Sequence, residues 1–324
     1  MVLNLDALGP HFHPPRDAQR VIGTYLYPLY FFGVQDPADA YSATEVITAV
    51  QAGPHEILIT RMGGLFVRPP SELSDLHRAT DEDEPADDLS AKLAFEDEAS
   101  NAFNRLICEL CLLGVVSQPT SPVHISYVLL AHGHVVITGA AGGREFYRER
   151  TMGPLADLLG PNWLMWPIRP ETVLQKAGSL TRANRLAEIS PSMPEFVAGA
   201  YSLYSQRQIN EALADSWVVC EQLLNYLWQR HCAEMADKPR KKRLDDTRTY
   251  SASVRLEVLR TAELLPDSLY QVLHKARDHR NKLLHRAKMD FQATSESMTA
   301  MKMMLEDILG EPIEPPETLQ GVNW

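Results

Sequence analysis

The stretch from Gln206 to His231 constrains the fold most, because it contains neither glycine nor proline. Its apolar side chains recur every three or four residues, which predicts one long amphipathic α-helix. The members of this apolar stripe are Ile209, Leu213, Trp217, Cys220, Leu224 and Leu227. A helix of this length needs neighbours that bury its stripe, so the stretch predicts a helical bundle.

The helical pattern begins near Pro191–Pro194 and ends at Gly310. Further helices are expected over Ser251–Leu265, Pro266–Lys288 and Ser295–Leu309. We therefore expect residues 195–310 to form an all-α bundle of four or five helices. Residues 311–324 contain three prolines and predict an extended or disordered tail.

Residues 1–190 predict a mixed α/β domain. Aromatic and β-branched runs bounded by glycine and proline predict strands at Val21–Phe32, Glu56–Val67, Val123–Leu130 and Val135–Thr138. The last two flank His132-Gly133 and predict a hairpin. Ala91–Leu113 has apolar residues at helical spacing and ends before a glycine, so we expect a helix there. The predicted fold class is α+β, with this mixed domain followed by the helical bundle.

The net charge of −11 is unevenly distributed along the chain. Residues 1–194 carry a net charge of −9, whereas residues 195–310 carry +1. Indiscriminate coating of nucleic acid is excluded by long-range repulsion, so any polyanion site must be local and in the second segment. The dense acids of Asp81–Asp88 predict a solvated, mobile loop that could occlude a cationic cleft.

Nothing in the sequence predicts a membrane protein or a secreted disulfide scaffold. The longest apolar stretch, Val21–Val34, is too short to span a bilayer, and no signal peptide pattern opens the chain. Four scattered cysteines fit a reducing cytosol. Cys108 and Cys111 lack a second pair of ligands, so buried thiols are favoured over zinc. We expect a cytoplasmic protein without a cofactor or a metal.

The most informative residues run from Ala276 to Arg286. At 100° per residue on a helix, one polar face between about 60° and 140° collects Arg277, Asn281, His274, His285 and Lys288. The expected buried stripe holds Leu269, Val272, Ala276, Leu283 and Ala287. Arg280 lies at the edge of that stripe, where an unpaired guanidinium is costly. It therefore needs a carboxylate, a phosphate or an interface.

The string Arg280-Asn281-Lys282-Leu283-Leu284-His285 resembles the motif of the HEPN superfamily, in which an arginine, a polar residue, three further positions and a histidine lie on a late bundle helix. The long preceding helix with Trp217 and Glu221 is similar to the first conserved helix of that family, and closest to the abortive-infection type called Apea-like. The resemblance covers about residues 195–310. It implies a metal-independent endoribonuclease that acts as a toxin or effector in anti-phage defence, with a site composed across a homodimer.

The residue types suit the implied chemistry. Arg280 could hold phosphate oxygens and stabilise transition-state charge. His285 could transfer a proton near neutral pH, and Asn281 could orient His285 or contact phosphate. Candidate RNA contacts are Arg277, Lys282, Lys288, Arg240, Lys241 and Lys242. Glu221 or Asp215 could offset part of the positive charge, and the N-terminal domain could recognise a phage or cellular trigger.

Less specific interpretations remain open at this point. Arg280 and His285 could be a structural arginine and a surface histidine, in a non-catalytic dimerising adaptor or nucleic-acid-binding module. The basic run Lys238–Arg243 favours a solvated loop over RNA contact. His132 and His134 could meet a metal with two N-terminal histidines, although a simple turn is favoured. A weaker hypothesis is modification by a nucleotidyltransferase-type antitoxin, with Tyr250 or Tyr270 as conceivable acceptors.

Overall fold

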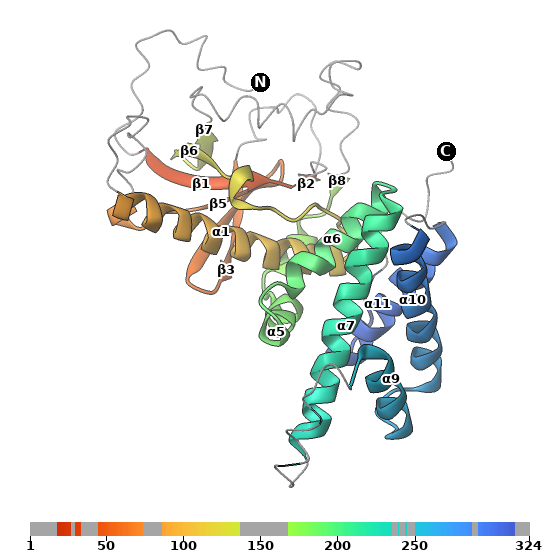
Figure 1. Cartoon of the computed structure of the whole chain (residues 1–324). Helices are drawn as coiled ribbons and strands as arrows, with labels where there is room; N and C mark the ends of the chain where they lie inside the picture. The colour runs from red at the N-terminus through yellow and green to blue at the C-terminus, as the bar shows by residue number, and fades with distance from the viewer. Residues whose placement is uncertain are drawn as a thin grey trace. The chain divides into compact units, whose positions relative to one another are not determined.

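The computed structural model describes residues 18–26, 30–33, 45–73, 86–136, 168–234, 239, 244, 250–286 and 291–314. It divides into two compact units (Figure 1). Unit 1 comprises Met1–Leu110 and Ser117–Leu180, and unit 2 comprises Cys111–Val116 and Thr181–Trp324. An antiparallel six-stranded sheet lies in unit 1 and most helices lie in unit 2, so the predicted α+β class is confirmed.

The sheet of unit 1 has the strand order β3-β4-β5-β1-β6-β7, and every neighbouring pair is antiparallel. Its strands are β1 (Gln19–Tyr25), β3 (Val46–Ala52), β4 (His55–Thr60), β5 (Gly64–Val67), β6 (Ser126–Ala131) and β7 (His134–Val136). Two short strands, β2 (Phe31–Phe32) and β8 (Ile168–Arg169), form a separate parallel pair. The hairpin predicted around His132-Gly133 is confirmed as the β6–β7 turn.

The two edges of this sheet meet at one point. Glu45, at the start of β3, forms an antiparallel bridge with His134 of β7, and the Val46 amide donates to the Gly133 carbonyl at 2.8 Å. The sheet is thus partly closed into a barrel. One apolar cluster draws on β1 and β4 to β7, namely Val21, Tyr25, Leu58, Met62, Phe66, Val128 and Val135. A Cβ on Gly23 would lie 2.3 Å from the Phe66 ring, so only glycine fits there.

Three predictions for unit 1 need correction. Glu56–Val67 is not one strand but the hairpin β4–β5, which turns at Arg61–Gly63, where Gly63 has a φ of +77°. The strand predicted over Val21–Phe32 is split into β1 and β2. Strand β3 was not predicted, because its alanines and glutamine interrupt the β-branched pattern.

Helix α1 (Ala86–Leu112) covers the outer face of the sheet. His55 packs edge-on against Phe95 of α1, and Ile57 and Ile59 share the His55 face of β4 because side chains alternate along a strand. The Asn104 side chain bonds both backbone groups of Thr120 and so fixes the loop that follows the helix. Residues 86–88 of the predicted acidic loop belong to α1, and residues 74–85 lie outside the described residues.

Unit 2 is helical, and its long helix lies at the centre. The helices are α5 (Thr181–Ile189), α6 (Met193–Ser205), α7 (Ile209–Ala233), α9 (Ala252–Thr261), α10 (Asp267–Arg286) and α11 (Phe291–Leu309). Helix α7 packs against α6, α9, α10 and α11, which confirms the long amphipathic helix. Helical structure begins earlier than expected, with α4 (Thr172–Ala177) and α5 ahead of Pro191.

The contacts between helices define two ends of unit 2. At one end, Thr294 near the start of α11 donates to the Ile209 carbonyl at the start of α7, and Phe291 stacks on Tyr204 of α6. The end of α10 lies here too, because His279 contacts Glu296 and α10 and α11 are separated by only four residues. We call this the α10-terminal end, after the C-terminus of α10. At the opposite end, Arg255 of α9 contacts Asn225 of α7.

Candidate functional site

Helix α10 carries the HEPN-like string, and its packing changes along its length. Leu269, Leu273 and Ala276 are buried, whereas none of the residues from Arg277 to His285 is. Leu273 lies outside the expected buried stripe and is nevertheless a core residue, whereas Leu283, a member of that stripe, is only half-buried. The first turns of α10 therefore contribute to the core, and its last two turns keep accessible side chains.

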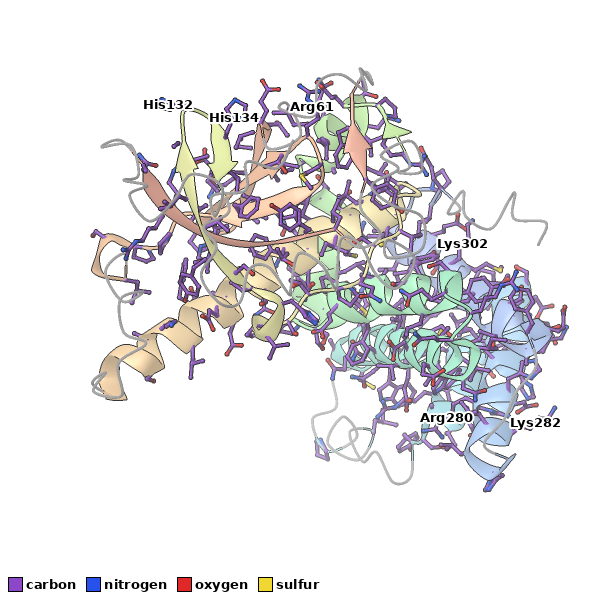
Figure 2. The ribbon with its side chains drawn as sticks, turned by 90° about the horizontal axis from the view of Figure 1, so that it is seen from above. Arg61, His132, His134, Arg280, Lys282 and Lys302 are labelled. Carbon is purple, nitrogen blue, oxygen red and sulfur yellow. The ribbon has the colours of Figure 1, made fainter. Side chains whose placement is uncertain are left out.

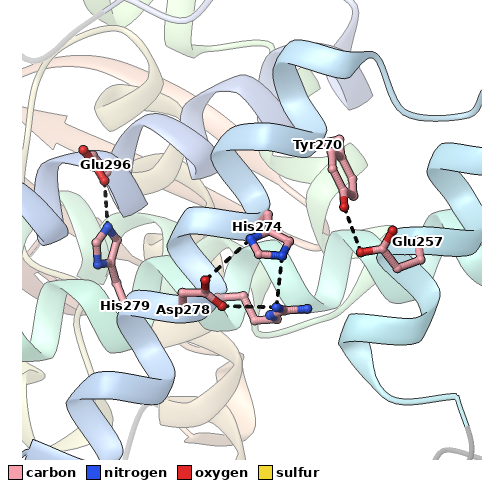
Figure 3. A network of polar contacts seen from close by, with 7 residues as sticks. Glu257, Tyr270, His274, Asp278, His279 and Glu296 are labelled. Atoms are coloured by element: carbon pink, nitrogen blue, oxygen red, sulfur yellow. Dashed lines mark hydrogen bonds and ion pairs between the residues drawn. The ribbon is translucent and has the colours of Figure 1, made fainter.

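Several polar groups in the N-terminal half of α10, Asp267–His279, are paired with one another or with α9 and α11. Arg277 Nη2 donates to His274 Nε2 at 3.3 Å and to Asp278 Oδ1 at 3.1 Å (Figure 3). The other ring nitrogen of His274, Nδ1, lies 3.6 Å from Asp278 Oδ2. Tyr270 donates to Glu257 of α9 at 2.8 Å. Arg277, predicted to contact RNA, is thus held by its own helix.

His279 was missed by the sequence analysis and links α10 to α11. Its Nε2 lies 2.7 Å from Glu296 Oε2 (Figure 3), and Glu296 Oε1 accepts from Gln292 at 3.0 Å. These hydrogen bonds, that of His279 first, lower the pKa of Glu296. This pairing holds α10 against α11 at His279, directly before Arg280, the first residue of the HEPN-like string. Its partner lies on another helix, so no local sequence pattern indicates it.

In the C-terminal half of α10, Arg280–Arg286, the described side chains include two cations, Arg280 and Lys282, that have no acidic partner among the described residues. Arg280 is half-buried, and its Nη1 donates to the neutral amide oxygen of Asn281 at 3.3 Å. Asn281, Lys282 and His285 are exposed, and Figure 2 marks Arg280 and Lys282 on α10. Within the described part of the chain, neither Arg280, Lys282 nor His285 contacts a carboxylate. Asn281 therefore orients Arg280, whereas the sequence predicted that it orients His285 or contacts phosphate.

An exposed leucine lies among these polar residues. Leu284 is 64% exposed and lies between Arg280 and His285 on the helical wheel, at about 40° from Arg280. Arg280 and His285 themselves are separated by about 140° around the helix axis, and the structure does not bring them into contact within one chain. Both side chains are accessible, so the groups that the motif requires are not sealed inside the bundle.

A further cation at the α10-terminal end was also missed. Arg207 lies in the turn between α6 and α7, is exposed, and has a φ of +60°. Its amide donates to the Tyr204 carbonyl, while its guanidinium has no partner among the residues that the structure describes. A side chain on a left-handed backbone position costs free energy, and such positions are enriched at functional sites. The unusual φ is a property of the folded turn and leaves no sequence signal.

The acids proposed to support the site lie on α7. Glu221 accepts from the Trp217 indole at 3.1 Å. Burial and the nearby charge of Glu195 raise the pKa of Asp215. Across the described helices, neither acid contacts Arg280 or His285, so within one chain the structure does not bring these two acids to the string.

The remaining candidate RNA contacts, Lys288, Arg240, Lys241 and Lys242, lie outside the described residues. Two described neighbours of the basic run pack at the opposite end of unit 2. Trp228 donates to the Leu244 carbonyl at 3.2 Å, and its ring lies 5.3 Å from that of Tyr250. Along α7, Trp228 is about 28 Å from Ile209.

The other sequence hypotheses concern metals, thiols and membranes. In the described ranges no three histidine, cysteine or acidic side chains are grouped as metal ligands, and His11 and His13 fall outside those ranges. All four cysteines are buried, and none of them forms a disulfide. Burial raises the pKa of the Cys220 thiol well above its usual range, which disfavours the reactive thiolate. None of the described helices has the length and apolarity to cross a bilayer.

Comparison with known proteins returned no matching family model, curated protein or solved structure. A function for this chain must therefore be inferred from the residues of α10 and from their surroundings.

Proposed function

We propose that the chain is a metal-independent, HEPN-type endoribonuclease that acts as a cytoplasmic toxin or effector in anti-phage defence. The observation that carries the proposal is the C-terminal half of α10, where Arg280, Lys282 and His285 are accessible and have no carboxylate partner in the part of the chain that the structure describes. Exposed cations without acids attract a polyanion, and this group includes the guanidinium and imidazole that phosphodiester cleavage needs. The anti-phage setting derives from the family resemblance alone.

The proposed reaction uses the RNA 2′-hydroxyl as nucleophile. One imidazole removes the hydroxyl proton while the 2′-oxygen attacks phosphorus and the P–O5′ bond breaks. A second imidazole gives a proton to the leaving 5′-oxygen, so the products are a 2′,3′-cyclic phosphate and a 5′-hydroxyl. Arg280, oriented by Asn281, holds the phosphate oxygens as negative charge builds.

Two imidazoles require two copies of α10 in this proposal. Each chain contributes one His285, and Leu284 is the exposed apolar residue that a two-fold partner would cover. Approach of two cationic helices is unfavourable without a bound anion, which couples pairing to RNA binding. In this scheme residues 1–190 form the trigger-sensing or restraining part.

The test is cleavage of total RNA in the presence of EDTA. We expect the wild-type chain to cleave and His285→Ala to lower the rate by about 100- to 10,000-fold, as loss of a proton-transfer group does. Arg280→Ala should reduce the rate comparably. The matched controls are His274→Ala, in the N-terminal half of α10, and Arg260→Ala, on α9. They remove an imidazole and a guanidinium that already have partners in unit 2. Equal rates for all five proteins would refute the assignment.

A second candidate function is a non-catalytic dimerising adaptor, favoured by the exposed Leu284. The adaptor hypothesis predicts that Leu284→Glu abolishes self-association in a chain that shows no EDTA-resistant cleavage. The ribonuclease proposal predicts loss of self-association and of cleavage together. Analytical ultracentrifugation beside the cleavage assay separates the two.

A further inference from the structure

Phe291 is an unusual feature of the α10-terminal end. It is the first residue of α11 and its side chain is 51% exposed, although large aromatic side chains usually bury most of their surface. Its ring stacks on Tyr204 of α6, with centroids 5.3 Å apart and planes at 19°. Tyr204 is only 6% exposed and covers one face of the Phe291 ring. The exposed fraction of Phe291 leaves the rest of the ring available to a flat partner.

The position of Phe291 relative to the candidate site follows from the His279–Glu296 contact. His285 lies six residues beyond His279, about 9 Å along α10. Phe291 lies five residues before Glu296, about 8 Å along α11 in the same direction, because the two helices are antiparallel neighbours. The exposed ring and the exposed imidazole therefore lie at the same level of the bundle.

Basic side chains lie at the same end of unit 2 as this ring. Arg207 follows Tyr204 by three residues, and Lys282 and His285 lie on the last turns of α10. In the described residues, no aromatic–cation contact involves Phe291. Proteins that bind single-stranded nucleic acid combine such cations, which contact phosphates, with aromatic rings on which bases stack.

We propose that Phe291, supported from behind by Tyr204, is a stacking platform for an unpaired nucleobase of the RNA. The inference deepens the proposed function, because it makes Phe291 a substrate-binding residue and requires a base that is free to leave a helix. A base inside a duplex is stacked on both sides by its neighbours and has no free face for Phe291. The platform therefore selects single-stranded segments. A phenyl ring accepts any base, and the platform therefore adds affinity with little sequence preference.

The experiment measures binding of a fluorescent 2′-O-methyl adenylate 12-mer to the full chain by anisotropy. This probe has stacked bases and phosphates but no nucleophile, so it is not cleaved. Phe291→Leu, which keeps an apolar side chain, should weaken binding about 5- to 150-fold, the change that loss of one base–aromatic stack produces. Phe291→Trp should bind within about threefold of wild type. Leu264→Ala, a truncation of an exposed apolar side chain at the opposite end of unit 2, should change nothing.

A second arm replaces the bases of the probe with abasic units. We expect the wild-type chain to bind this probe as weakly as Phe291→Leu binds the adenylate. Unchanged binding by Phe291→Leu would overturn the inference, as would a folded Phe291→Leu variant that loses self-association, because Phe291 would then be a subunit contact. If the wild-type chain binds the adenylate probe but does not cleave RNA, the ribonuclease proposal is refuted and the stacking role of Phe291 stands. A Phe291→Leu variant that cleaves and binds as wild type would refute the platform alone.

Discussion

The two halves of α10 belong to one continuous helix and differ in how their polar side chains are satisfied. In the N-terminal half, Asp267, Tyr270 and Asp278 each have a partner on α9 or α10. In the C-terminal half, Arg280 donates to the Asn281 amide and has no acidic partner among the described residues, and His285 is exposed. Paired charges stabilise a fold, whereas accessible unpaired charges indicate a ligand. The comparison teaches that a basic helix face is informative only after its internal partners are known.

The largest expected effect is the difference in stability between two variants, each with a leucine truncated in one half of α10. Leu273→Ala should lower the free energy of unfolding by about 2 to 5 kcal/mol, because Leu273 is fully buried and its removal leaves a cavity. Leu284→Ala should change it by less than about 0.5 kcal/mol, since Leu284 is exposed. Urea denaturation of both variants measures the difference. Similar losses would show that both halves of α10 are packed alike.

An intermediate effect is expected at the boundary between the halves, where Glu296 meets His279. The folded-state pKa of Glu296 lies below its reference value of 4.5, so its ionised form stabilises the fold above that pH. This contribution should be lost as the pH falls through the lowered pKa. Glu296→Gln should remove that part of the acid dependence when stability is followed by urea denaturation between pH 6 and pH 3. If stability fell with decreasing pH in this variant as it does in the wild type, the His279 contact would contribute nothing to the free energy of unfolding.

The smallest effect is expected at the start of α10. Asp267 pairs with Arg260 at 2.6 Å, but both side chains are well exposed. Asp267→Asn should cost about 0.2 to 1 kcal/mol, and less at high salt, because water screens such pairs. Thermal unfolding at low and high ionic strength measures this cost. A loss of several kcal/mol would contradict the view that this half is stabilised mainly by its buried leucines.

Features fixed by local chemistry were predictable from the sequence. The long α7 follows from its apolar spacing without glycine or proline, and the β6–β7 hairpin follows from the turn at His132-Gly133. The bridge between Glu45 and His134, which partly closes the sheet, joins residues 89 positions apart and leaves no local pattern. Strand β3 was missed for the related reason that its stability comes from pairing with β4.

The candidate site shows the same division. Arg280, Asn281 and His285 were identified from their spacing, and the structure adds that they are accessible. The helical wheel placed Leu273 and Leu284 only about 20° apart, yet one is buried and the other exposed. Their difference depends on how far the neighbouring helices extend along α10. His279 and Arg207 were missed because one pairs with another helix and the other is defined by its backbone conformation.

The most direct test of the central claim is whether cleavage depends on the ribose 2′-hydroxyl. Once a cleavage position has been mapped in a short RNA with EDTA present, the same RNA is made with one 2′-deoxy nucleotide at that position. We predict that the wild-type chain leaves a 2′,3′-cyclic phosphate on the all-ribose strand and no longer cuts the substituted position. Continued cleavage at the deoxy position, or cleavage that needs a divalent metal, would contradict the account.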